Sequence, residues 1–417
     1  MTASPRTGIS AHRAQFGLLV LLNAFVGGMV GLERTVLPLI AAAEFGLASK
    51  TAIVAFIATF GVSKALVNFV AGDWGDRFTR RRVLVLGWAL ALPVPLILLW
   101  ANSWWWVLGA NVLLGVNQGL AWSMTVVMKI DLADAGERGL ATGLNEFAGY
   151  GGLALVALLT GLVASRYGLR PEPFSLGLAL AGLGLGLSLL VKDTTAHAER
   201  ARETGEPGEA PSLAAVFRRT SIGDATLSAA SLGGLATNLK DGMLWGLLPL
   251  FLAAAGLGVD RTGVVATYPA VWGVSQLAFG PLSDRLGRKA LIVPGLAAQA
   301  LGVAGFLWAT GYVGYLVAAV LTGLGTGMVY PTFLALVSDV AEASWRSSAL
   351  GIYRFWRDLG YAVGALGSAA VADLLGLDTA VAAVAAFTGL VTLVFALRAH
   401  DPVTPHEPAP EAAGLPD

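Results

Sequence analysis

The chain has 417 residues, of which 56% are hydrophobic and only 13% are charged, whereas soluble domains are about 25% charged. It contains no cysteine, which excludes disulfide bonds, cysteine-ligated metal centres and a thiol nucleophile. Its 27 basic and 27 acidic residues give a net charge of zero, so a general electrostatic attraction to nucleic acid is missing. These numbers predict an all-α membrane protein that binds no nucleic acid.

Apolar segments of roughly 20 residues, the length that a helix needs to cross a bilayer, follow one another from about residue 15 onward. We predict twelve transmembrane helices. Their expected ranges in chain order are 15–42, 50–72, 83–101, 104–130, 138–165, 173–192, 223–254, 261–283, 290–309, 312–340, 346–373 and 376–398.

Hydrophilic segments divide this series into two sets of six helices. Residues 1–14 are expected to form a cytoplasmic tail, 15–192 an N-terminal six-helix bundle, and 223–398 a C-terminal six-helix bundle. The charged segment 193–222 is predicted to be a cytoplasmic linker. Residues 399–417 contain five prolines and are predicted to be a disordered cytoplasmic tail.

Basic residues gather on one predicted side of the membrane. With the N-terminus placed inside, 17 of the 27 lysines and arginines fall in cytoplasmic segments and four fall outside. This distribution satisfies the positive-inside rule. We therefore expect a multi-pass protein of the cell inner (plasma) membrane that is embedded as a monomer in the lipid bilayer, with both termini cytoplasmic.

The two halves repeat each other at a constant offset of 208 residues. Aligned acidic, basic and aromatic positions extend over about a hundred residues, which chance would hardly supply. The aligned pairs include Asp76 with Asp284, Arg77 with Arg285, Arg80 with Arg288, Asp131 with Asp339, Arg138 with Arg346 and Phe147 with Phe355. Because each half has an even number of spans, the repeats are parallel and the two bundles are pseudo-symmetric.

A charged motif occurs once in each half. The segment 72–82 reads GDWGDRFTRRR, and the segment 280–289 reads GPLSDRLGRK. They resemble the signature of the loop between the second and third helices of the major facilitator superfamily, although Thr79 stands where that family usually has glycine. The resemblance implies the major facilitator fold: two bundles around a central cavity that opens alternately to either side.

The resemblance also implies a conformational latch formed by these loops. The residues to which we assign gating are Gly72, Asp76, Arg77, Arg80, Gly280, Asp284, Arg285, Gly287 and Arg288. On physical grounds alone, a glycine at a helix end permits a sharp turn, and a carboxylate is stabilised near a helix N-terminus. Basic loops also keep their side of the protein in the cytoplasm.

Ionisable residues inside the predicted spans are the candidates for transport chemistry, because a buried charge in a membrane costs several kcal/mol. We assign proton or ion coupling to Glu33, Asp241, Glu146 and Asp358. All four histidines lie outside the spans, so a histidine relay is excluded, and the coupling ion is a proton or sodium. Substrate binding is assigned to Arg34, Asn117, Gln118, Asn145, Lys240, Tyr330, Arg354 and Arg357. Structural pairing between helices, such as Lys64 with Asp358, is the competing interpretation.

The sequence has no phosphate-binding loop of the Walker type, no Gly-x-Ser-x-Gly elbow and no His-Glu-x-x-His pair, so it predicts no enzyme, no cofactor and no metal site. We expect a secondary active transporter that moves a small organic solute by alternating access, with proton coupling. Export of a drug or metabolite is favoured over uptake. However, Gly115 stands where the drug–proton antiporters of the superfamily that this sequence resembles usually have an arginine. The alternatives are an organic-anion importer or exchanger built on Arg354, Arg357 and Lys240, and a non-transporting membrane sensor or scaffold.

Overall fold

The computed structural model describes residues 8–133, 137–195, 211–257, 263–342 and 345–401, and in this part of the chain it contains helices and no strands. Within the helices, the side chains of residues 69, 70, 72, 73, 75, 76, 138, 139 and 347 are not described. The first half contains α1 (Gly8–Ala11), α2 (Arg13–Arg34), α3 (Leu37–Ala43), α4 (Lys50–Phe78), α5 (Arg80–Ala91), α6 (Pro93–Trp100), α7 (Trp104–Asn117), the π-helix η1 (Gln118–Trp122), α8 (Ser123–Leu132), α9 (Arg138–Tyr167) and α10 (Glu172–Ser188). The second half contains α12 (Leu213–Arg218), the π-helix η3 (Arg219–Gly223), α13 (Ala225–Ala254), α14 (Gly263–Leu286), α15 (Arg288–Trp308), α16 (Gly311–Val340), α17 (Arg346–Leu375) and α18 (Leu377–Arg398).

Each predicted span coincides with one helix or with consecutive helices. In the described residues, eight candidate spans are long and apolar enough to cross a membrane. The count of twelve therefore stays a prediction. The first span is divided into α2 and α3, where Pro38 occupies the first turn of α3. The third is divided at Leu92, directly before Pro93. These breaks follow from proline, which cannot donate the hydrogen bond that a continuous helix requires.

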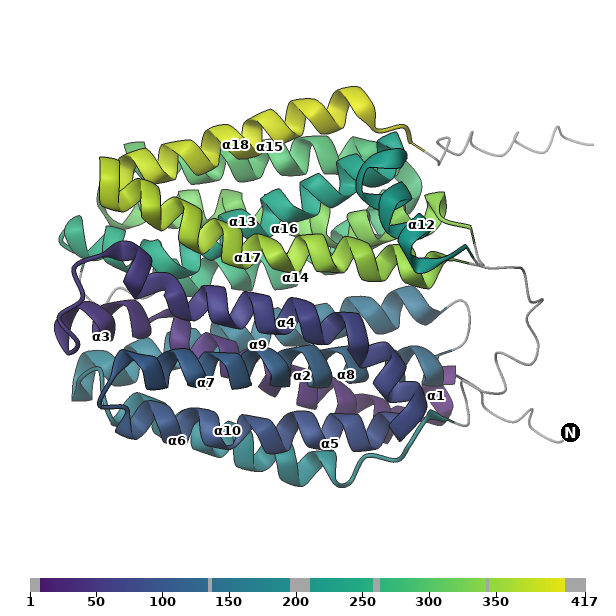
Figure 1. Ribbon diagram of the computed structural model, residues 1–417, viewed down its shortest axis with the longest axis horizontal. Coiled ribbons are helices and arrows are strands. Elements are labelled where there is room, and N and C mark those ends of the chain that lie inside the picture. Colours follow the sequence, from purple (N-terminus) through teal and green to yellow (C-terminus); the bar gives the residue numbers. More distant parts are fainter. Residues whose placement is uncertain (1–7, 134–136, 196–210, 258–262, 343–344, 402–417) are drawn as a thin grey trace, which may run out of the picture.

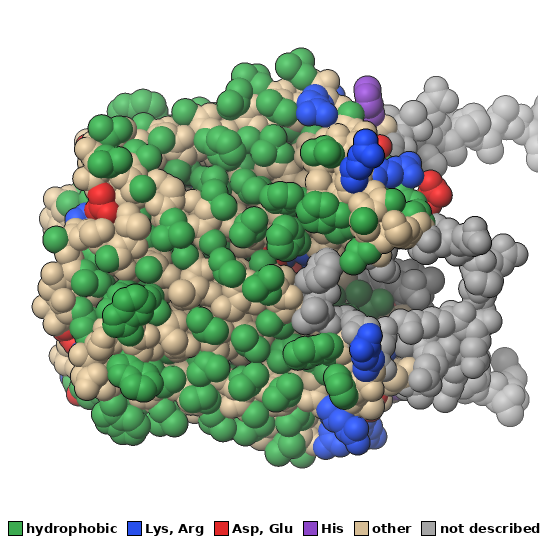
Figure 2. Space-filling model, in the orientation of Figure 1, with side chains coloured by type: hydrophobic (Ala, Val, Ile, Leu, Met, Phe, Trp, Pro, Cys, Tyr) green, Lys and Arg blue, Asp and Glu red, His purple; other side chains and the backbone are tan. Residues whose placement is uncertain are grey.

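The helices of the first half lie on one side of the molecule and those of the second half on the other (Figure 1). The largest contacts between the halves are those of α4 with α17 and of α9 with α14, and α13 also packs against α3 and α4. The lateral surface is covered by hydrophobic side chains, and lysines and arginines gather at one end (Figure 2). That end is the predicted cytoplasmic one, and an apolar band of this kind fits a lipid environment.

The segments outside the spans differ in part from the prediction. Residues 213–223 of the predicted linker are helical, and α1 lies within the predicted N-terminal tail. Residues 1–7, 196–210 and 402–417 of the predicted tails and linker are outside the described residues. At the start of the C-terminal tail, the Asp401 carboxylate accepts hydrogen bonds from the backbone N–H groups of Arg288 and Lys289, so this residue is ordered.

The offset of 208 residues holds at several helix ends. Helices α5 and α15 begin at Arg80 and Arg288, and α9 and α17 both have 30 residues, starting at Arg138 and Arg346. Glycines permit equally close approach in both halves. A Cβ atom on Gly152 would lie 2.0 Å from the carbonyl oxygen of Ala24, and one on the equivalent Gly360 would lie 2.4 Å from that of Leu235. The glycine excess therefore serves close helix packing at these positions.

The loop that precedes α5 and α15 has the same unusual backbone in both halves. Thr79 has φ 76° and Gly287 has φ 93°, a region that favours glycine and is strained for a β-branched residue. Asp193 accepts a hydrogen bond from the Arg81 backbone N–H at 3.0 Å, just as Asp401 does from Lys289 at 2.9 Å. Partial burial raises the pKa of Asp193, but the hydrogen bonds from Thr195, Arg81 and the Thr79 hydroxyl outweigh it and lower the pKa below its usual value.

Replacing Gly287 by alanine tests this shared loop geometry. A Cβ at this position would lie 2.6 Å from the Asp401 Oδ2 atom on a backbone with positive φ, so we expect Gly287→Ala to lower stability by about 1–3 kcal/mol. Thermal unfolding of the purified protein in detergent measures the effect. Gly389→Ala is the control, because a Cβ there meets no atom within 4 Å. An unchanged unfolding midpoint for Gly287→Ala would contradict this account.

Candidate functional site

A small cavity that is partly open to solvent lies between the two halves. Its lining comes from α4, η1, α8 and α9 of the first half and from α16 and α17 of the second half. The lining residues are Lys64, Asn68, Trp122, Ser123, Glu146, Tyr330, Leu334, Arg354 and Arg357. The cavity therefore contains three basic side chains and one acidic side chain, together with two large aromatic residues.

Two of the three basic side chains in the cavity have no ion-pair partner among the described residues. The Lys64 ammonium lies over the rings of Phe60, Trp122 and Tyr361, at 5.4–5.7 Å from their centroids, and donates to no carboxylate oxygen within 4.0 Å in the described residues. Arg354 reaches the cavity from one turn before Arg357 on α17. The aromatic faces stabilise the lysine charge without neutralising it.

The third basic side chain is neutralised by a carboxylate. Arg357 bonds to Asp358 through its Nε and Nη2 atoms, both at 2.9 Å. The Asn68 side chain on α4 donates to Asp358 Oδ2 at 2.5 Å. The Asn238 side chain on α13 donates at 3.3 Å to Oδ1, the oxygen that Arg357 also binds. Asp358 is therefore engaged by Arg357 and by both halves, whereas the expected pair of Lys64 with Asp358 does not form in this structure.

The acidic side chain of the cavity is held by neutral donors. The Oε1 atom of Glu146 accepts hydrogen bonds from the Trp122 indole and from the Asn145 side chain, both at 3.0 Å. Tyr330 completes this region, with the Arg357 guanidinium 4.7 Å from its ring centroid. Six predicted site residues therefore meet in or beside the cavity: Asn145, Glu146, Tyr330, Arg354, Arg357 and Asp358.

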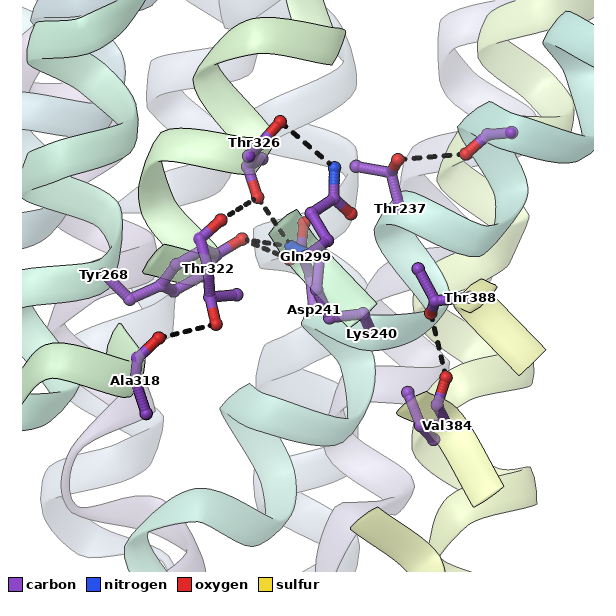
Figure 3. Close-up of polar contacts among 12 residues, drawn as sticks. Thr237, Lys240, Asp241, Tyr268, Gln299, Ala318, Thr322, Thr326, Val384 and Thr388 are labelled. Carbon is purple, nitrogen blue, oxygen red and sulfur yellow. Dashed lines mark hydrogen bonds and ion pairs between the residues drawn. The ribbon is translucent and has the colours of Figure 1, made fainter. Parts of the chain in front are cut away.

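Lys240 and Asp241 lie away from this cavity, in the interior of the second half. The Lys240 ammonium donates to Asp241 at 2.5 Å and to the Tyr268 and Thr326 hydroxyls at 2.9 Å each (Figure 3). The Tyr268 hydroxyl also donates to Asp241. Both charged side chains are fully buried. An ammonium has three donors, and here all three have acceptors, so Lys240 has none left for a substrate in this conformation.

Glu33 and Arg34 are buried at the end of α2 near the boundary between the halves. Both are at most 1% exposed. Neither Glu33 oxygen and none of the three Arg34 nitrogens has a hydrogen-bond partner in the described part of the chain. The Arg34 guanidinium instead lies 4.7–5.4 Å from the ring centroids of Phe56, Phe60 and Trp245. Unsatisfied buried charges of this kind are expensive and indicate a functional position.

Two amide side chains of the predicted fourth span, which were expected to bind substrate, have structural partners. Asn117 donates to the Gly87 carbonyl at 3.0 Å, and Gln118 donates to the Val26 carbonyl at 2.7 Å. Both side chains are fully buried. They join α7 and η1 to neighbouring helices of the same half, and neither lines the cavity.

The latch residues form matching ion pairs within each half. Arg80 bonds to Asp131 at 2.6 Å, and the equivalent Arg288 bonds to Asp339 at 2.8 Å and to Asp284 at 2.6 Å. Arg77 and Arg285 have exposed side chains. A Cβ on Gly280 would meet open space, and the side chains of Gly72 and Asp76 lie outside the described residues. The conformational latch that these loops are expected to form thus stays a prediction.

Sequence reasoning missed a contact that joins the halves at the predicted outer end. The Asp373 carboxylate, two residues before the end of α17, accepts hydrogen bonds from the Ser49 hydroxyl at 2.7 Å and from the backbone N–H groups of Lys50 and Thr51 at 2.5 and 2.9 Å. It therefore caps the N-terminus of α4 from the other half. Lys64 was also left out of the predicted site. A lysine within an apolar predicted span was the feature of the sequence that could have indicated it.

Removing the Asp373 carboxylate is expected to loosen the closure at this end. A cysteine introduced by Val54→Cys reports the change, because Val54 is fully buried beside Gly246 of the other half and the natural chain has no cysteine. In that background, Asp373→Ala is expected to raise the rate of labelling by a membrane-impermeant maleimide about tenfold, which corresponds to about 1.4 kcal/mol. Asp378→Ala is the matched control, since this exposed residue lies at the same end without a contact across the halves. Equal labelling in both variants would exclude a closing role for Asp373.

An all-helical architecture with two similar halves and a charged cavity between them defines a multi-pass membrane transporter. A family model described as "Major Facilitator Superfamily" matches residues 19–363 and 230–416. The chain belongs to the major facilitator superfamily, and this membership indicates a non-enzymatic transporter.

Two curated relatives are also described as transporters. The "Probable 4-methylmuconolactone transporter" of Cupriavidus pinatubonensis is 27% identical over 244 residues, which are 55% of this chain and 54% of the relative. The "Triacylglyceride transporter/" of Mycolicibacterium smegmatis is 28% identical over 142 residues, which are 33% of this chain and 25% of the relative. The chain therefore spans between a quarter and about half of the length of these relatives.

Two solved structures share the fold. The nucleoside transporter NupG matches with a TM-score of 0.75 and 12% identity, covering 91% of this chain and 98% of that protein. The human organic anion transporter MFSD10 matches with a TM-score of 0.67 and 16% identity, covering 92% and 99%. At these identities, both similarities concern the fold of the chain.

Proposed function

We propose that this protein carries a small organic anion across the inner membrane by alternating access, coupled to protons. The single observation that carries the proposal is the excess of positive charge in the cavity between the halves. Arg357 is paired with Asp358, but Lys64 and Arg354 have no ion pair among the described residues. Glu146, the acidic residue of the lining, accepts hydrogen bonds from two neutral groups.

Two cations beside one carboxylate make an anionic ligand the natural complement of this cavity. A guanidinium such as Arg354 can hold a carboxylate through two parallel hydrogen bonds. Trp122 and Tyr330 offer apolar faces to the organic part of a ligand. This arrangement favours the organic-anion hypothesis over a carrier of neutral or cationic compounds, with Arg354 rather than Lys240 as the binding residue.

Loss of the Arg354 charge is expected to weaken transport of anions selectively. Arg354→Gln should raise the KM for an organic anion at least tenfold, equivalent to about 1.4 kcal/mol, and leave the KM for a neutral analogue within about twofold. Counterflow in proteoliposomes measures both values. Arg166→Gln serves as the control, because this arginine is exposed at the end of α9, away from the cavity. An equal loss for both solutes would assign Arg354 a structural role.

Glu33 is our first candidate for the proton carrier. Both of its oxygens are buried without a hydrogen-bond partner in the described residues, so the side chain is free to gain or lose a proton without breaking a contact. Asp241 has one unpartnered oxygen, but its other oxygen is bound to Lys240 and Tyr268. Asp358 is occupied by Arg357, Asn68 and Asn238, and Glu146 faces the cavity.

Glu33→Gln tests this assignment. A glutamine preserves the shape but cannot exchange a proton, so we expect transport driven by a pH gradient to fall at least tenfold while solute exchange stays within about twofold of the wild-type rate. Asp241→Asn is the paired variant, and it should impair both activities because it leaves the Lys240 ammonium without its carboxylate. Gradient-driven transport that survives Glu33→Gln would exclude Glu33 as the carrier. The same vesicles, energised by a sodium gradient, decide between the two coupling ions.

We also propose export as the direction of net transport, which would begin with a solute in a cavity near the cytoplasmic end. Its residues Glu146 and Arg354 lie eight residues after the starts of α9 and α17, at the predicted cytoplasmic end. Toward the other end, the halves meet through stacked rings of Tyr150 and Trp272 with centroids 3.5 Å apart. A solute would therefore enter this conformation from the cytoplasm. Measuring anion movement in right-side-out and inside-out vesicles determines the direction.

A further inference from the structure

A partition of three aromatic side chains closes the cavity toward the predicted outer end. Phe60 comes from α4 of the first half, whereas Tyr361 and Trp245 come from α17 and α13 of the second half. The Tyr361 ring stacks on Trp245 with centroids 4.7 Å apart and meets Phe60 at 6.1 Å. All three rings are at most 4% exposed, so water is excluded here.

One unpaired cation lies on each side of this partition. Lys64 faces the cavity, with its ammonium 5.7 Å from the Phe60 centroid and 5.4 Å from that of Tyr361. Arg34 contacts the partition from the opposite side, with its guanidinium 4.7 Å from Phe60 and 4.8 Å from Trp245. Along the helices, Arg34 lies nine residues before the end of α3 at Ala43, roughly 14 Å, and Lys64 lies fourteen residues after Lys50, roughly 21 Å. Arg34 is thus nearer the outer end.

The Arg34 guanidinium has no hydrogen-bond acceptor within reach in the described residues, although the carboxylate of the neighbouring Glu33 interacts with it electrostatically. Its planar fork offers five N–H donors suited to a carboxylate. None of its three nitrogens has an acceptor in the described chain, although the side chain is 1% exposed. The neighbouring Glu33 leaves both of its own oxygens unpaired and forms no ion pair with Arg34. The aromatic faces compensate the charge in part, and the donors stay unused.

Both cations belong to the first half, while two of the three partition rings belong to the second. If the halves separate at the outer end, Trp245 and Tyr361 leave together as one stacked pair. Arg34, Phe60 and Lys64 then stay behind on the same surface, and the guanidinium becomes accessible. Tight contacts show that the partition closes by direct packing: a Cβ on Gly61 would lie 3.0 Å from the Tyr361 Cβ, and one on Gly246 would lie 2.6 Å from a Val54 methyl.

We propose that Arg34 is a second anion-binding site, which receives the substrate carboxylate from Lys64 when the Phe60–Tyr361–Trp245 partition opens. The inference rests on the proposed transport of organic anions and narrows the substrate class to carboxylates with a flat, unsaturated body. The carboxylate binds the guanidinium through paired hydrogen bonds, and the flat body passes between ring faces that accept offset stacking. A bulky or strongly hydrated aliphatic acid fits such a passage poorly.

Benzoate is the probe that tests the inference, and benzamide is its neutral analogue. Wild-type proteoliposomes should show saturable benzoate counterflow that benzamide does not inhibit, after uptake by protein-free liposomes is subtracted. Arg34→Gln should reduce this counterflow at least tenfold while benzoate binding to the resting protein, measured by thermal shift, changes less than twofold. Lys64→Gln should instead weaken that binding about tenfold, because Lys64 faces the open cavity.

A second variant covers the case in which Arg34→Gln does not fold. Arg34→Lys preserves the charge over the rings but loses the paired donors, so benzoate inhibition from the outer face should weaken about tenfold and inhibition from the inner face should not change. Right-side-out and inside-out vesicles measure the two faces separately. If Arg34 has only a structural role, Arg34→Lys will leave benzoate inhibition unchanged at both faces.

The failures of the two proposals are distinguishable. If the wild-type protein exchanges neither benzoate nor any other organic anion, the proposed function is wrong. If it exchanges benzoate and both Arg34 variants do so at the wild-type rate with unchanged inhibition at each face, the second site is wrong and organic-anion transport stands. If lactate is exchanged as well as benzoate, the restriction to flat carboxylates is wrong.

Discussion

The structure depends on how charge is accommodated in an interior without water. A charged group in the membrane interior needs an opposite charge, hydrogen-bond partners or an aromatic face, because its hydration has been lost. The protein uses all three solutions. Lys240 and Asp241 form a closed pair with hydroxyl partners, Asp358 combines an arginine with two amides, and Arg34 and Lys64 have aromatic rings. Only the last solution leaves the hydrogen-bond donors available to a ligand.

Buried acidic residues at equivalent positions of the two halves have different partners. Glu33 and Asp241 are related by the offset of 208 residues, but only Asp241 has a cationic partner within hydrogen-bond distance. The charge of Asp241 is therefore balanced within its own half, whereas Glu33 lies without an ion pair near the boundary between the halves. The loops behave in the opposite way, since Arg80 with Asp131 and Arg288 with Asp339 repeat the same ion pair. The two halves therefore keep the same ion pair in these loops but differ in how they accommodate this buried acidic position.

This difference explains how far the sequence could predict the structure. Apolar length predicted where the helices lie, and the repeat predicted that Asp131 and Asp339 would be equivalent, because both depend on local pattern. The partners of individual charges depend on helix rotation and packing, which the sequence does not display. Lys240 was predicted to bind substrate, but its three donors all have acceptors within the second half. Asp373 is an acidic residue in the otherwise apolar end of α17, and nothing in the sequence indicated that it reaches α4 of the other half.

An aromatic partner is well suited to a charge that must be uncovered in every transport cycle. A buried carboxylate opposite Arg34 would hold the halves together strongly and would compete with an anionic substrate for the same donors. A ring face contributes less, about 0.5–2 kcal/mol, and makes no directional bond that must be broken. Trp245 can therefore withdraw at modest cost, and the guanidinium it uncovers retains its full capacity for a carboxylate. The weakness of the contact between Arg34 and Trp245 is thus the property that allows one surface to serve both as a closed barrier and as a binding site.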